Sequence, residues 1–114
     1  MLTIETLQAF GADTQEGLAR CCNSEALYLR LVRMLPADDN FDALHEAVQA
    51  GDLDSAFSAA HALKGILGNL SLTPMFALSS KITELLRVHE DADYPALVAE
   101  LLSQRNALQA LCAE

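Results

Sequence analysis

The chain has 114 residues, with 7 basic and 16 acidic side chains and a formal net charge of −9. Hydrophobic residues make up 52% of it, which favours one folded domain over residues 1–114 and argues against disorder. The acidic charge argues against binding to nucleic-acid phosphates, which requires a cationic surface. Apolar runs far shorter than about 20 residues predict no membrane span. Residues 1–5 lack the basic and apolar stretches of a signal peptide, so we expect a cytoplasmic protein.

Several enzyme classes are excluded because their motifs are missing. The sequence has no glycine-rich phosphate loop, no dinucleotide fingerprint and no nucleophile elbow. The spacing of Cys21, Cys22 and Cys112 fits neither a disulfide framework nor a four-ligand zinc site. We expect free thiols, with Cys112 filling part of the core. Any chemistry must therefore rest on very few residues.

The sequence predicts a chain built from helices. Proline and glycine occur only 3 and 5 times, alanine and leucine dominate, and runs of β-branched residues are absent. Capping residues, glycines and prolines predict helices at residues 3–11, 13 onward, 23 or 24–35, 41–50, 52 or 54–70, 73–89 and 93–112. Residues 36–40 are expected to form an acidic loop, and Gly51 to stop the helix before it. Thr73 is expected to cap the helix that Pro74 begins.

The last two predicted helices each carry an apolar stripe at helical spacing. The stripe residues are Met75, Leu78, Ile82, Leu85 and Leu86 on one helix and Tyr94, Leu97, Leu101, Leu108 and Cys112 on the other. Short connections make neighbouring helices antiparallel. We therefore expect an all-α protein, an up-and-down antiparallel four-helix bundle with one or two extra N-terminal helices, acting as a monomer.

The helix predicted over residues 54–70 places a histidine opposite its apolar stripe. With about 100° per residue, the stripe lies between about 140° and 240° from His61. Its members are Ala56, Ala59, Leu63, Ile66, Leu67 and Leu70. Gly65 and Gly68 lie within about 40° of His61. His61 and the two glycines are therefore expected to share one outward face.

The two glycines on this face destabilise the helix, so their presence calls for a functional reason. Each internal glycine lowers helix stability by roughly 1 kcal/mol relative to alanine. We infer that a macromolecular partner requires bare backbone beside His61. Ser58 and Lys64 flank His61 at about 60° on either side. Imidazole has an ordinary pKa of about 6.5, so near neutral pH it is a nucleophile that can carry a phosphoryl group. The Lys64 ammonium can reach such a group and neutralise its charge.

The segment 61–70, HALKGILGNL, resembles the core of histidine-containing phosphotransfer (HPt) domains of two-component phosphorelays, whose pattern is His-x-x-Lys-Gly on a mid-bundle helix. The resemblance extends from about Leu7 to Leu111. It implies that His61 accepts the phosphoryl group and that Lys64 neutralises it. Gly65 and Gly68 would then give clearance to a docking partner.

The resemblance also implies the partners. These are response-regulator receiver domains, with a hybrid or separate histidine kinase upstream, and the receiver supplies the Mg²⁺, so this chain needs no cofactor. Phe57, Ser58 and Ala62 border His61 and are further candidates for partner contact. The sequence departs from the family at the glutamine that many members offer from the following helix. Ser79, Ser80, Thr83 or a water molecule could take its place.

Two other functions compete with a phosphorelay intermediate. A non-catalytic helical adaptor would dock signalling partners without phosphate, and His61→Gln would then leave its function intact. A metal site from His45, His61 and His89 is disfavoured because no paired His-x-x-Glu or His-x-x-x-His spacing supports it. We expect His45 to be partly buried and His89 to lie in the last turn of its helix, where the helix dipole favours a cation.

Overall fold

The computed structural model describes residues 1–113, which form helices and no strands. The elements are α1 (Ile4–Phe10), α2 (Thr14–Arg20), α3 (Glu25–Met34), the short 3-10 helix η1 (Leu35–Ala37), α4 (Asp39–Gln49), α5 (Leu53–Asn69), α6 (Thr73–Arg87) and α7 (Tyr94–Ala113). The expected all-α class is confirmed. No helix within these residues is long and apolar enough to cross a membrane.

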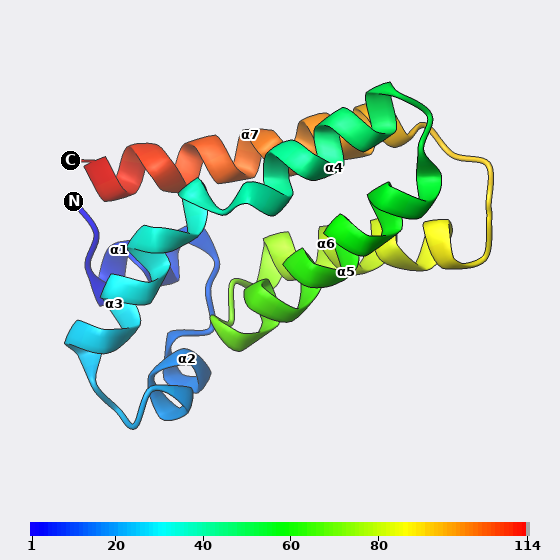
Figure 1. The fold of residues 1–114 in the computed structure, drawn as a ribbon. Helices are drawn as coiled ribbons and strands as arrows, with labels where there is room; N and C mark the ends of the chain where they lie inside the picture. The colour runs from blue at the N-terminus through cyan, green and yellow to red at the C-terminus, as the bar shows by residue number, and fades with distance from the viewer. Residues whose placement is uncertain (114) are drawn as a thin grey trace.

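Helices α4 to α7 form a bundle. Each packs against the next along the chain, and α7 also packs against α4. Figure 1 shows α4 and α7 lying over α5 and α6, with the chain direction alternating from one helix to the next. Helices α1 to α3 gather at the end of the bundle where α5 turns into α6 (Figure 1).

Three short helices precede the bundle, in the three segments where capping residues predicted helices, one more than the one or two extra helices of the expected bundle. The breaks between them lie at Gly11, with φ of 121°, and at Cys22 and Asn23, with φ of 56° and 58°. Backbone with positive φ cannot continue a right-handed helix, so each break separates two helices. The N-terminal signals themselves are confirmed, since Thr3 and Asp13 accept hydrogen bonds as N-caps of α1 and α2.

The starts of two helices differ from the sequence prediction. The expected loop over residues 36–40 is partly helical, because the Asp38 carboxylate accepts a hydrogen bond from the Asn40 backbone N–H at 2.8 Å and starts α4 at Asp39. Thr73 is the first residue of α6 instead of its cap. Its hydroxyl donates to the Ser71 carbonyl oxygen at 3.4 Å, and no side chain caps this helix.

The expected apolar stripes face the core. Met75, Leu78, Ile82 and Leu86 of α6 are buried, as are Tyr94, Leu101 and Leu108 of α7. The remaining stripe residues, Leu85, Leu97 and Cys112, are half-buried against that core. Burial raises the pKa of the Cys112 thiol, which therefore stays protonated near neutral pH.

Tyr28 of α3 ties the N-terminal helices to the bundle. Its side chain is completely buried, and its hydroxyl donates to the carbonyl oxygen of Leu70 at 2.7 Å, just beyond the end of α5. Gly17 of α2 makes room for the ring, because a Cβ there would lie 2.3 Å from the Tyr28 Cζ. Burial, and to a smaller extent the nearby Cys21 and Asp13, raises the pKa of Tyr28 to about 12.

This pKa predicts a loss of stability in alkaline solution. Between pH 10 and 12 the unfolded chain releases the Tyr28 proton while the folded chain keeps it. The contribution of protonated Tyr28 to the free energy of unfolding is therefore complete below pH 10 and is lost as pH rises through about 12. Its size is on the order of 2 to 3 kcal/mol. Near neutral pH we expect Tyr28→Phe to be about 1 to 3 kcal/mol less stable than the wild type, because the Leu70 carbonyl loses its donor. Urea unfolding at several pH values should show this gap narrowing above pH 10, and a constant gap would contradict the assignment.

Candidate functional site

His61 lies in the middle of α5 and faces away from the core. The Asp52 carboxylate accepts a hydrogen bond from the Ser55 N–H at 3.1 Å and starts the helix. The stripe opposite His61 is buried as expected at Ala56, Ala59, Leu63, Leu67 and Leu70, Ala60 joins it, and Ile66 is half-buried. The His61 side chain is exposed. The apolar period of α5 therefore fixes which side of the helix carries the imidazole.

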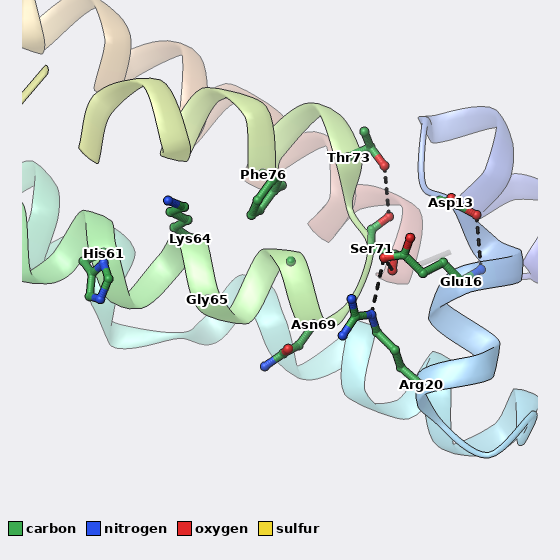
Figure 2. A pocket seen from close by; sticks show the side chains of 11 residues that line it. Asp13, Glu16, Arg20, His61, Lys64, Gly65, Asn69, Ser71, Thr73 and Phe76 are labelled. Carbon is green, nitrogen blue, oxygen red and sulfur yellow. Dashed lines mark hydrogen bonds and ion pairs between the residues drawn. The ribbon is translucent and has the colours of Figure 1, made fainter. Parts of the chain in front are cut away.

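A groove of about 570 Å³ runs along the outward face of α5. Its lining residues are Asp13, Glu16, Arg20, His61, Lys64, Gly65, Gly68, Asn69, Ser71, Thr73 and Phe76. Figure 2 shows His61 and Lys64 at one end of the groove, and Glu16 and Arg20 of α2 with the N-cap Asp13 at the other. Four residues expected to act together, His61, Lys64, Gly65 and Gly68, thus line one groove.

The two glycines differ in what surrounds them. A Cβ at Gly65 would meet no atom within 4 Å, so this side of α5 is open beside His61. A Cβ at Gly68 would lie 3.0 Å from Cε1 of Phe76, so the α6 ring already occupies that space. Gly68 therefore has a packing reason within the chain itself, whereas Gly65 has none.

Lys64 lies on the side of α5 nearer to α6 and is half-buried (Figure 2). Within residues 1–113 it has no hydrogen bond and no ion pair. Its ammonium group is therefore available to an anion that enters the groove next to His61.

The far end of the groove is built by α2 and the turn after α5. The Glu16 carboxylate accepts hydrogen bonds from the Ser71 hydroxyl at 3.0 Å and from Arg20 Nε at 3.3 Å, and Figure 2 shows the three side chains close together. The backbone N–H of Asp13 donates to the Ser71 carbonyl oxygen at 2.9 Å. Sequence reasoning missed this wall, because residues about 55 positions apart form it and no local pattern predicts such a contact.

The model of the family described as Hpt domain matches residues 36–114, which is more than half of the chain. The chain belongs to the Hpt domain family. Membership gives it a histidine phosphotransfer role in two-component signalling, where relays join histidine kinases to response regulators. The same comparisons find no match to a curated protein or to a solved structure. The matched residues begin at Pro36, within η1, and include the whole bundle, while α1 to α3 precede them.

The other expected contact residues of this Hpt domain do not line the groove. Phe57 and Ser58 line a separate hollow of about 380 Å³, together with Arg87 and His89. Ala62 is half-buried and lines neither hollow.

None of the three expected substitutes for the family's glutamine holds the imidazole. The Ser79 hydroxyl donates to the Phe76 carbonyl oxygen at 3.0 Å, and the Thr83 hydroxyl donates to the Ser79 carbonyl oxygen at 2.7 Å. Both residues are fully buried, and their hydroxyls bond within α6. The Ser80 hydroxyl oxygen is enclosed and has no hydrogen-bond partner among the described residues.

The remaining histidines differ from expectation. His45 is exposed instead of partly buried, because Phe41 and Leu44 already fill the buried side of α4. His89 lies beyond α6, which ends at Arg87, and has a φ of 55°. Across residues 1–113, no group of three or more His, Cys, Asp or Glu side chains is arranged to hold a metal ion.

Proposed function

We propose that this Hpt domain accepts a phosphoryl group on His61 from the aspartyl phosphate of a receiver domain and passes it to the aspartate of another. The observation that carries the proposal is the exposed imidazole beside an unpaired lysine and an open glycine face. His61, Lys64 and Gly65 lie within two turns of one helix and line one groove. A receiver aspartate on a partner's surface can reach His61 only if both backbones come close, and Gly65 permits that approach.

The transfer needs little from this chain. The lone pair of the unprotonated ring nitrogen of His61 forms a bond to phosphorus as the bond from phosphorus to the aspartate oxygen breaks. The carboxylate leaves with that electron pair, and the proton on the other ring nitrogen stays or passes to water. Negative charge spreads over the equatorial oxygens in the transition state, where the Lys64 ammonium stabilises it. The reverse sequence returns the group to an aspartate.

We propose that Mg²⁺ and the carboxylates that hold it belong to the receiver, and that this chain contributes no cofactor. The two acidic residues in the groove support this division, because both lie away from the histidine end. Glu16 is already bonded to Ser71 and Arg20, and the Asp13 carboxylate accepts a hydrogen bond from the Glu16 backbone N–H at 3.1 Å. A divalent cation reduces the repulsion between the receiver's own carboxylates and the phosphoryl group.

The test is a transfer experiment with a panel of purified receiver domains charged with labelled phosphate. Label should move to this chain within the mixing time and appear in an acid-labile, base-stable form, as expected for phosphohistidine. A receiver that binds the chain at the groove and never transfers label would contradict the proposal and favour the adaptor. Mapping the bound receiver by amide shifts of residues 61–68 identifies groove binding.

A further inference from the structure

The orientation of the His61 ring has no hydrogen bond to explain it. No described residue donates to or accepts from the imidazole, and the hydroxyls of Ser79 and Thr83 are bonded within α6. An exposed histidine without a partner samples several side-chain rotamers. A nucleophile in such a state spends only part of its time pointing at the reacting phosphorus, which slows the reaction.

The imidazole instead stacks on an aromatic ring one turn earlier in α5. The ring centroids of Phe57 and His61 are 5.8 Å apart, and the ring planes differ by 11°. Positions four apart on a helix are neighbours on one face, so the contact is built into the sequence spacing. Nearly parallel rings at this distance are offset, so the Phe57 ring borders the imidazole on one side, and the His61 side chain remains exposed to solvent.

Phe57 is itself held from α6. The Arg87 guanidinium carbon lies 5.2 Å from the centroid of the Phe57 ring, within the range of a cation–π interaction. Arg87 Nε in turn donates to the Glu84 carboxylate at 3.2 Å. A continuous series of contacts therefore leads from Glu84 on α6 to His61 on α5.

We infer that Phe57 is a positioning residue for His61, doing by stacking what a hydrogen bond from the next helix would otherwise do. The inference rests on the proposed function, and it gives Phe57 a role inside the chain in place of, or besides, contact with a partner. Loss of the ring should let the imidazole rotate freely. The stack should be worth about a 3- to 10-fold difference in the rate of phosphorylation, the range expected for an aromatic pair.

The experiment compares the wild-type chain with Phe57→Leu, Phe57→Tyr and Phe10→Leu. Leucine keeps apolar bulk without a ring, and tyrosine restores the ring. Phe10 is another half-buried phenylalanine, on α1 and outside both hollows, so its variant controls for a general loss of packing. Phosphoramidate serves as the phosphoryl donor because it reacts without protein docking. The imidazole nitrogen bonds to phosphorus as the P–N bond of phosphoramidate breaks, and ammonia leaves.

Two readouts are expected to agree. In NMR spectra of the histidine-labelled chain, the His61 ring protons should carry a ring-current shift from Phe57, keep that shift in Phe57→Tyr and lose it in Phe57→Leu. Phosphorylation should be about 3- to 10-fold slower in Phe57→Leu and within about twofold of wild type in the other two variants. An unchanged ring shift or an unchanged rate in Phe57→Leu would overturn the positioning role while leaving the proposed function in place. A wild-type chain that accepts phosphate from neither phosphoramidate nor any receiver would overturn both.

Discussion

His61→Gln is expected to abolish the transfer of label from phosphorylated receivers, down to the level of a blank without the chain. Glutamine is polar and of similar length, but its amide nitrogen has no lone pair available to attack phosphorus. Because His61 is exposed, the change should alter the free energy of unfolding by no more than about 1 kcal/mol. Single-turnover transfer and urea unfolding of the same preparations provide the two measurements.

The chain supplies its own controls for this variant. His45 and His89 are also exposed histidines, and neither lines the groove that contains His61. His45→Gln and His89→Gln should transfer label at the wild-type rate within about twofold. If transfer survived in His61→Gln and disappeared in one of the other two variants, that other histidine would be the phosphoaccepting residue.

Gly65→Leu is expected to raise stability and suppress transfer at the same time. Leucine has a much higher helix propensity than glycine, and no atom lies within 4 Å of the new Cβ, so unfolding should require about 0.5 to 1 kcal/mol more. The side chain would stand beside His61, where it would hold the receiver aspartate away from the imidazole. A displacement of about 1 Å can slow such a reaction about 100-fold, so we expect transfer to fall by about 10- to 100-fold.

Donor size separates this steric effect from damage to the histidine. Phosphoramidate is small enough to reach His61 past leucine, so its reaction with Gly65→Leu should stay within about threefold of wild type. Ala110→Leu adds the same exposed side chain on α7, away from the groove, and should leave receiver transfer unchanged. A Gly65→Leu chain that exchanges phosphate with receivers at full speed would refute the need for close backbone approach.

Much of α5 could be predicted because its signals are local. The Asp52 cap, the apolar period and the outward direction of His61 depend on residues within one helix, and all three appear in the structure. The role of Gly68 could not be predicted in the same way. Whether its bare surface faces solvent or a neighbour depends on where α6 places the Phe76 ring.

Polar residues in the core mark a second limit. Ser79 and Thr83 read as polar positions on α6, yet both are buried, because each hydroxyl bonds to a carbonyl oxygen of its own helix. The spacing of apolar residues does not predict the burial of polar side chains whose hydrogen bonds are made within their own helix. The contacts of Phe57 could be predicted only in part. The stack on His61 follows from spacing within α5, whereas the cation–π contact depends on Arg87, which lies on another helix.

The groove has two walls of different origin. One wall comes from α5 and the start of α6, within the residues that match the family, and the other comes from α2 and its N-cap Asp13, which precede them. The second wall is fastened to the turn after α5 through the contacts of Glu16 and Asp13 with Ser71. Substitutions among the first 35 residues can therefore reshape one side of the groove while His61, Lys64 and Gly65 stay as they are. On the proposed function, the choice of receiver could then change through α2 without any change in the residues that carry the phosphoryl group.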